Sequence, residues 1–111
     1  MIEINSTSEF MEALDKQGVV VVDFFAEWCK PCQQMLKILP NLEKDVEDKA
    51  VIIKVDIDKN PDIKQMYEVT SVPTFIFFKD MHEVSRFNGV KLLREIKQEI
   101  EEQHNNKWGG W

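Results

Sequence analysis

The residues best suited to chemistry are two cysteines, the only ones in the chain, within the segment Trp28-Cys29-Lys30-Pro31-Cys32. The segment follows an apolar run and precedes a helical pattern, so we expect the cysteines at the start of a helix. The partial positive charge of a helix N-terminus stabilises an anion, and the thiolate is the reactive form of cysteine. Lys30 adds a cation beside Cys29, and Pro31 suits an early helical position. This context predicts an activated thiol with a second thiol close enough to form a disulfide.

Such a pair predicts thiol–disulfide exchange. We expect Cys29, at an exposed lip, to attack a substrate disulfide, and Cys32, one turn further in, to resolve the mixed disulfide. Three alternatives stay open: inert buried cysteines, half of a zinc site, and a cysteine-protease nucleophile. Zinc would need two more ligands, and the only histidines, His82 and His104, lack zinc-finger spacing. A protease would need a histidine base, and these two fall in a loop and near the tail.

The strands that position this pair can be recognised from apolar patterns. Residues 19–25 and 51–56 are apolar runs rich in β-branched side chains, which is typical of strands buried on both faces. Residues 74–78 form a third strong strand, and residues 84–87 a weaker one. The loop 79–82 has hairpin length but no glycine, so its turn type stays open.

Two helices are expected in the first half of the chain. Ser6 and Glu9 form a capping-box pattern before a short helix, which we expect Gly18 to end. A second helix is expected after Cys32, and Pro40 is expected to kink it or divide it in two. Its apolar stripe consists of Met35, Leu36, Leu39, Leu42 and Val46.

Two further helices are expected in the second half. After a turn at 60–62, residues 63–67 favour a short helix. The last helix is amphipathic and runs to about Gln103, with Leu92 or Leu93, Ile96 and Ile100 on its apolar face. Strands alternating with helices, followed by two strands in succession, predict an α/β domain with a mixed sheet and helices on both faces.

Composition limits the class of protein. The 111 residues suit one domain, and 43% hydrophobic with 31% charged residues is ordinary for a globular protein. A net charge of −6 argues against a broad nucleic-acid surface. The N-terminus lacks a signal-peptide pattern, and no apolar run approaches the ~20 residues of a membrane span. We therefore expect a cytoplasmic location, where thiols stay reduced.

Four segments together resemble one known family, the thioredoxins. Residues 22–32 resemble its active-site segment. In the same order, residues 54–61 resemble its third strand and following turn, residues 71–75 the segment with its cis-proline, and residues 87–89 the glycine that ends its last strand.

The resemblance covers residues 2 to about 102 and implies the thioredoxin fold, with a central mixed sheet of about five strands and about four helices. It places the domain at residues 1–103 and leaves residues 104–111 as a C-terminal tail. That tail, with Trp108 and Trp111, could be disordered, fold back or bind a partner, and its polar and glycine content favours disorder.

The resemblance implies a thiol–disulfide oxidoreductase that reduces protein disulfides and serves electron transport and cell redox homeostasis without a bound cofactor or metal. Its partners would be thioredoxin reductase or an equivalent electron donor and disulfide-containing protein substrates. It would act as a monomer, away from nucleic acid and membranes. Two other functions stay open: a thioredoxin-like oxidase or isomerase, and a non-catalytic binding module.

Two charged residues in apolar strands gain roles from the resemblance. Asp23 lies where an ionised carboxylate is costly, and the resemblance implies a buried acid beneath the cysteines that relays the proton of Cys32. The alternative is a strand-end residue that reaches water. Lys54 resembles the lysine near that acid, and its alternative is a lysine at the edge of its strand that extends to solvent.

The resemblance also implies a substrate-binding groove. Pro73 opens a strand, where its missing N–H is tolerated. A cis Val72–Pro73 peptide would place Val72 opposite the cysteines, where its backbone could pair with an extended substrate. Trp28 could instead pack in the core. The implied substrate-binding residues are Trp28, Lys30, Pro31, Val72, Pro73 and Gly89.

The sequence departs from the usual family pattern at several positions. The family most often has glycine where Lys30 stands, so we expect Lys30 to stabilise the Cys29 thiolate, to raise the reduction potential slightly, or to change which partners dock. Lys37 stands at the usual helix proline, and Pro40 lies further on, so the kink is expected to move. Phe25 replaces a frequent tryptophan, which changes volume rather than chemistry.

Overall fold

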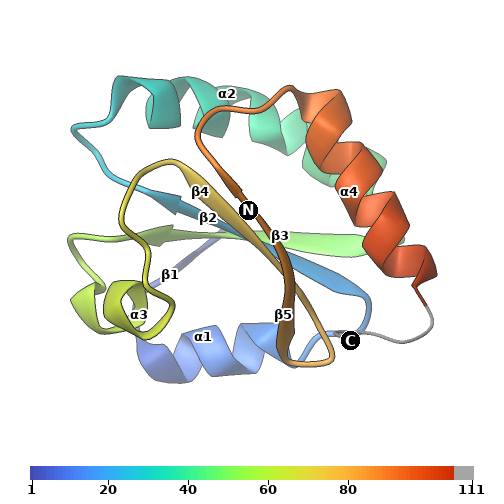
Figure 1. Cartoon of the computed structure of the whole chain (residues 1–111), viewed down its shortest axis with the longest axis horizontal. Coiled ribbons are helices and arrows are strands. Elements are labelled where there is room, and N and C mark those ends of the chain that lie inside the picture. The colour runs from blue at the N-terminus through green and yellow to red at the C-terminus, as the bar shows by residue number, and fades with distance from the viewer. Residues whose placement is uncertain (107–111) are drawn as a thin grey trace.

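The computed structural model of the chain describes residues 1–106 as a five-stranded sheet with two helices on each face (Figure 1). Its elements are β1 (Ile2–Ile4), α1 (Thr7–Leu14), β2 (Val19–Phe25), α2 (Lys30–Asp45), β3 (Ala50–Asp56), α3 (Pro61–Met66), β4 (Thr74–Lys79), β5 (His82–Asn88) and α4 (Leu93–Asn105). The strand order is β1-β3-β2-β4-β5, and only the β2–β4 and β4–β5 pairs are antiparallel. This topology confirms the predicted mixed sheet. No helix within residues 1–106 is long and apolar enough to span a membrane.

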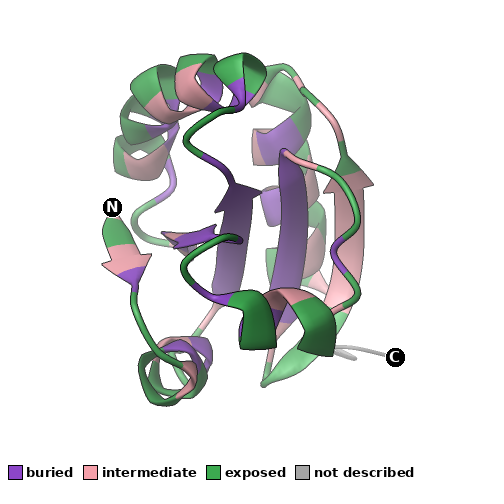
Figure 2. Ribbon diagram, turned by 90° about the vertical axis from the view of Figure 1, so that its left-hand side faces the viewer, coloured by how far each residue is buried: buried purple, intermediate pink, exposed green. Residues whose placement is uncertain are grey.

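The central strand β2 contributes to a separate apolar core on each face of the sheet. All seven of its residues are buried. Val20 and Val22 pack with residues of α1, whereas Val19 and Val21 pack with residues of α2 and α4. A strand buried on both faces needs no polar alternation, which explains its continuous apolar pattern. Figure 2 shows the buried central strands and the exposed outer faces of the helices around them.

Strand β1 is the element that the apolar pattern does not reveal. It has three residues, of which only Ile4 is buried, so its alternation is too short to stand out. It lies at the edge of the sheet beside β3, with Glu3 opposite Lys54 in parallel register. The fifth strand implied by the family resemblance is therefore β1.

The first helix begins as predicted but ends earlier. The Ser6 hydroxyl accepts the Glu9 N–H at 3.1 Å, and the Glu9 carboxylate accepts the Asn5 N–H at 2.9 Å. The helix ends at Leu14, so the prediction that Gly18 ends it is wrong. Gly18 has φ +83°, and a Cβ there would lie 2.6 Å from the Lys49 carbonyl oxygen. The glycine is needed for this close approach between the segments leading into β2 and β3.

The boundaries of α2 and α3 also differ from the prediction. Helix α2 begins at Lys30 rather than after Cys32, because Cys29 serves as its N-cap. Pro40 lies inside α2 without dividing it. Helix α3 begins at Pro61, within the predicted turn, since a proline is well suited to the first turn of a helix.

The last helix runs slightly past the predicted end at Gln103, to Asn105. A lysine from β4 holds this end: the Lys79 ammonium donates to the carbonyl oxygens of Gln103, His104 and Asn106 at 2.7, 3.1 and 2.6 Å. A cation at a helix C-terminus is favourable because the last carbonyls there lack intrahelical partners. The remainder of the predicted tail, including Trp108 and Trp111, lies outside the described residues.

The β4–β5 hairpin has a two-residue turn that composition could not identify. Lys79 pairs with His82, and both intervening residues have positive φ, 51° for Asp80 and 72° for Met81. Positive φ at both positions is typical of a type I′ turn, which usually carries glycine at the second position. Met81 therefore holds a backbone conformation that is unfavourable for a side chain.

We predict that Met81→Gly stabilises the protein by about 0.5–1 kcal/mol, because glycine adopts this conformation without the steric cost of a Cβ. Urea denaturation measures the change in the free energy of unfolding. Met81→Ala is the matched control, since it removes the exposed side chain but keeps the Cβ. Equal stabilities of the alanine and glycine variants would contradict the prediction.

Candidate functional site

Four segments that are distant in the sequence meet at one end of the sheet. Strand β3 is parallel to β2, and β4 is antiparallel to it, so the ends of β2 and β3 lie beside the start of β4 and the end of β5. Thr74, for example, lies opposite both Phe24 and Asn88. Figure 2 views the molecule from this end. The topology therefore brings together the cysteine segment, the loop after β3, the Val72–Pro73 segment and Gly89.

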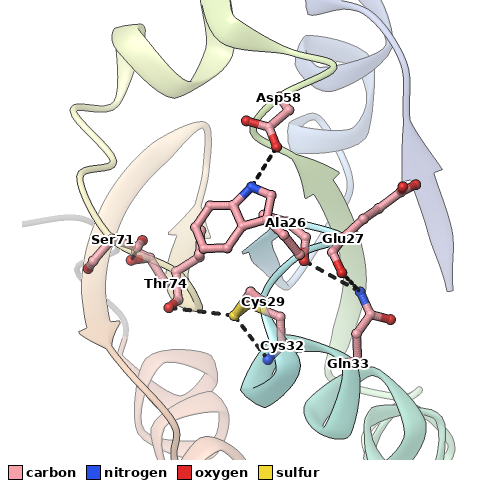
Figure 3. Close-up of a disulfide and its surroundings, with 10 residues drawn as sticks. Ala26, Glu27, Cys29, Cys32, Gln33, Asp58, Ser71 and Thr74 are labelled. Atoms are coloured by element: carbon pink, nitrogen blue, oxygen red, sulfur yellow. Dashed lines mark hydrogen bonds between the residues drawn. A yellow bond between two sulfur atoms is a disulfide. The ribbon is translucent and has the colours of Figure 1, made fainter.

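The two cysteines form a disulfide at the N-terminus of α2, with their Cα atoms 5.2 Å apart (Figure 3). Cys29 is the N-cap residue, and its sulfur accepts the Cys32 N–H at 3.2 Å. Cys29 is 6% exposed and Cys32 is fully buried. The expectation of an exposed lip at Cys29 is therefore wrong for the disulfide form, because the Val72 segment lies against its sulfur. Cys29 is still the more accessible of the two.

Lys30 and Pro31 occupy the first turn of α2, and both are exposed. The first turn presents unpaired backbone N–H groups, so a thiolate formed at Cys29 would lie at the positive end of the helix dipole. The Lys30 charge is on the same turn and open to solvent. This position fits the expected influence of Lys30 on Cys29 and limits its strength, since water and salt screen an exposed charge.

Trp28 lies on the surface beside the disulfide rather than in the core. It is 69% exposed, which excludes the core-packing alternative. Its indole N–H donates to the Asp58 carboxylate at 2.9 Å (Figure 3). Asp58, in the loop after β3, therefore orients an exposed aromatic ring at the site. Sequence reasoning missed this role because the two residues approach only after β2 and β3 have paired.

The Val72–Pro73 segment lies opposite the cysteines, as the resemblance implied. The peptide bond is cis, and the Val72 carbonyl oxygen lies 3.9 Å from the Cys29 sulfur. Gly89, with φ +93°, donates its N–H to the Pro73 carbonyl oxygen at 2.8 Å. Gly89 thus holds Pro73 in place through a backbone hydrogen bond from the residue that follows β5.

Two further residues hold this segment and carry no signal in the sequence. The Thr74 hydroxyl donates to the Ser71 carbonyl oxygen at 2.7 Å. The Arg86 guanidinium donates to the Tyr67 carbonyl oxygen at 2.9 Å while pairing in two bonds with the Glu83 carboxylate. These bonds tie the chain before Pro73 to β4 and β5, so its backbone faces the disulfide from a supported position.

Asp23 is a fully buried acid in the middle layer of the molecule. It is 0% exposed, which excludes the strand-end alternative, and neither carboxylate oxygen has a hydrogen-bond partner. Asp23 lies two residues after Val21 in β2, so its side chain is on the same face of the sheet as Val19 and Val21. Helices α2 and α4 cover this face. Burial raises the pKa of Asp23 to about 7, and the charge of Lys54 opposes this rise. The acid can therefore exchange its proton near neutral pH.

Lys54 is the register partner of Asp23 on the neighbouring strand β3. Its side chain is 27% exposed and forms an ion pair with Glu3, with 3.8 Å between Nζ and Oε1. Its ammonium also lies 5.7 Å from the centre of the Phe25 ring. Lys54 is therefore both next to the buried acid and in reach of solvent, which combines the two roles considered for it.

A metal centre has no set of ligands in the described part of the chain. Among residues 1–106, no group of three or more His, Cys, Asp and Glu side chains is placed to hold a metal ion. The two cysteines are joined to each other, and the histidines lie at the start of β5 and in the last turn of α4.

Comparison with known proteins identifies the family. The thioredoxin family model matches residues 1–102. The chain is 44% identical to a thioredoxin of Chlamydia pneumoniae over 82% of its own length and 87% of that protein. It is 38% identical to a thioredoxin of Staphylococcus aureus over 91% and 97% of the two chains. It is also 40% identical to thioredoxin Y1 of Arabidopsis thaliana, a chloroplastic protein of which it spans about half, 48%.

The fold agrees with solved structures. A thioredoxin mutant from Halobacterium salinarum superposes with a TM-score of 0.88 at 28% identity, covering 95% of this chain and 91% of that one. The thioredoxin of Fasciola hepatica superposes with a TM-score of 0.84 at 33% identity, covering 92% and 98%. Thioredoxins reduce protein disulfides by dithiol–disulfide exchange. The chain belongs to the thioredoxin family, and the Cys29–Cys32 pair makes it a thiol–disulfide oxidoreductase.

Proposed function

We propose that the protein reduces disulfides in other proteins, with Cys29 as the nucleophile and Cys32 as the resolving thiol. The observation that carries this proposal is the position of Cys29: it caps α2, is the less buried cysteine, and faces the Val72 carbonyl oxygen. Trp28, Lys30, Pro31, Val72, Pro73 and Gly89 form the substrate-binding surface in this proposal. An extended substrate segment pairs with the Val72 backbone and presents its disulfide to the Cys29 sulfur.

The reaction proceeds in two exchanges. The Cys29 thiolate attacks one sulfur of the substrate disulfide, and the other substrate sulfur leaves as a thiolate. The Cys32 thiolate then attacks the Cys29 sulfur, which forms the Cys29–Cys32 disulfide and releases the second substrate thiolate. Two electrons pass to the substrate, and an electron donor must reduce the protein disulfide before the next cycle.

Asp23 supplies the proton transfer that the second exchange needs. Cys32 is fully buried, so its thiol must lose a proton without direct access to water. Asp23 lies on the sheet face that α2 covers, has unpartnered carboxylate oxygens, and has a pKa near neutral. In this proposal the ionised Asp23 carboxylate accepts the Cys32 proton and becomes neutral, and Lys54 balances the carboxylate charge before the transfer.

The family also suggests the cellular setting. The proposed partners are thioredoxin reductase or an equivalent donor and disulfide-containing proteins, and the proposed role is electron transport in redox homeostasis. We propose a monomer whose catalytic domain is residues 1–103, with residues 104–111 as a C-terminal segment that includes the end of α4. A cytoplasmic location fits reduced thiols. The similarity to a chloroplastic thioredoxin makes an organelle the second candidate location.

Two measurements separate this function from its alternatives. An oxidase or isomerase would have a clearly more oxidising Cys29–Cys32 reduction potential than a reductase. A non-catalytic binding module would keep its biological role in the Cys29→Ser variant, whereas a reductase would lose it.

We predict that Cys32→Ser accumulates mixed disulfides between Cys29 and substrate proteins, because the second exchange is blocked. The bound proteins should be released by dithiothreitol and can then be identified by mass spectrometry. Cys29→Ser is the matched control and should trap little, since the remaining Cys32 is fully buried. Trapping by Cys29→Ser but not by Cys32→Ser would reverse the proposed roles.

We predict that Lys30→Gly lowers the reduction potential by at most roughly 20 mV, corresponding to about 1 kcal/mol of lost thiolate stabilisation at an exposed position. Lys30→Gln should give a similar shift, which separates the charge from the added flexibility of glycine. Equilibration with glutathione buffers measures the potential, and high salt should reduce both shifts. An unchanged or raised potential would defeat the electrostatic explanation.

We predict that Asp23→Asn stabilises the protein above pH 7 and has little effect near pH 4. Burial raises the pKa of Asp23 from 3.8 to about 7 on folding, so the folded state binds more protons than the unfolded chain between these values. Stability therefore falls as the pH rises through this window. At ~1.4 kcal/mol per pKa unit, the gain above pH 7 is at most ~4 kcal/mol.

Urea denaturation of the disulfide form at pH 4 and pH 8.5 tests this difference. Asp48→Asn, which changes an exposed aspartate, is the matched control and should leave the pH dependence of stability unchanged. A gain of equal size at both pH values would show that Asp23 does not titrate with folding as described.

A further inference from the structure

Three charged residues form one row across the sheet. Glu3 on β1 is the register partner of Lys54 on β3, which is in turn the register partner of Asp23 on β2. Side chains of residues directly opposite each other in a sheet project from the same face. The row is therefore acid, base and acid, with the lysine in the middle.

The lysine in this row is paired with the outer acid. Its ammonium lies 3.8 Å from the Glu3 carboxylate, whereas neither Asp23 oxygen has a hydrogen-bond partner. Glu3 is also partly sheltered, with 30% of its side chain exposed. The lysine in register with the buried acid is therefore paired with a second acid on the edge strand β1.

Further charged groups surround the Lys54–Glu3 ion pair. The Lys59 ammonium lies 3.9 Å from Glu3 and 3.5 Å from Glu27. Asp56, further along β3, is buried and accepts the Asp58 N–H at 2.9 Å.

Among the described residues, those that the remaining elements bury around Asp23 include no titratable group in the disulfide form. Strand β4 places Phe75 opposite Asp23. The buried residues that α2 and α4 contribute are Cys32, Met35, Leu39, Leu42, Ile96 and Ile100, and the disulfide leaves Cys32 without a thiol to titrate. Lys54 is therefore the one cation, among the described residues, in register with the buried acid, and its ammonium is paired with Glu3.

We propose that Glu3 is a positioning residue for proton exchange at Asp23: by pairing with Lys54, it keeps that cation from neutralising the Asp23 carboxylate. The proposal deepens the function proposed above and rests on it for the use of the Asp23 proton. Glu3 acts in two ways, and both raise the pH at which Asp23 loses its proton. It adds a negative charge to the row, and it draws the ammonium towards solvent, so Asp23 keeps its proton to higher pH.

The test is the titration of the Asp23 carboxyl carbon, followed by ¹³C NMR in the disulfide form of the full chain. Glu3→Gln should lower the titration midpoint by about half a pH unit, as expected for a unit charge two strand spacings away. Glu101→Gln is the matched control, because it removes the acid that pairs with Lys49 and should leave the midpoint in place. An unchanged or raised midpoint in Glu3→Gln would overturn the proposal.

A double-mutant cycle with Lys54→Met tests whether Glu3 acts through the lysine. Lys54→Met alone should raise the midpoint, and Glu3→Gln should shift it less in that background than in the wild type, since the ion pair is already absent. Equal shifts in both backgrounds would overturn the positioning role and leave only a direct charge effect.

The pH dependence of substrate release distinguishes this proposal from the proton relay itself. If Asp23 relays the Cys32 proton, the pH profile of mixed-disulfide resolution should move with the NMR midpoint in Glu3→Gln. A shifted midpoint with an unmoved release profile would overturn the relay and leave the positioning of Lys54 by Glu3 supported.

Discussion

The burial of β2 on both faces is the constraint on which the rest of the structure depends. All of its residues are buried, which requires a partner strand on each side and a helical layer on each face. The parallel partner β3 and the antiparallel partner β4 then bring two distant loops to the end of β2, and β5, paired with β4, adds a third. The cysteine segment follows β2 directly, so the site forms where the buried strand reaches the surface.

Local patterns were sufficient to predict most of the elements. The apolar runs of β2, β3 and β4 and the helical stripes of α2 and α4 were visible because each is long enough to show its period. Strand β1, with three residues, was too short to show one. The reactive cysteine pair was predictable from its place between an apolar run and a helical pattern. Asp23 was conspicuous as a carboxylate inside an apolar run, but its burial was implied only by the family resemblance.

Features that depend on contacts between distant segments could not be predicted. Gly18 is required by its close approach to the Lys49 carbonyl oxygen, not by the end of a helix. Asp58 orients Trp28, and Arg86 holds the Tyr67 carbonyl oxygen, yet each is an ordinary surface charge in the sequence. The burial of Cys29 was also missed, because the Val72 segment that covers it lies 43 residues further along the chain. Such residues become identifiable only once strand order is known.

The buried acid links the stability of this fold to its chemistry. Desolvation raises the pKa of Asp23 to about 7, as the proposed proton relay requires, and the same desolvation makes its ionised form a destabilising group. Full neutralisation by Lys54 would remove that instability and would also hold the carboxylate in its charged form. Lys54 also pairs with Glu3 at the edge of the sheet, so it neutralises Asp23 only in part. Its charge opposes the rise in the pKa of Asp23, and its ion pair with Glu3 keeps it from abolishing that rise. The short edge strand that the apolar pattern failed to reveal thus carries the residue that adjusts the charge balance at the centre of the sheet.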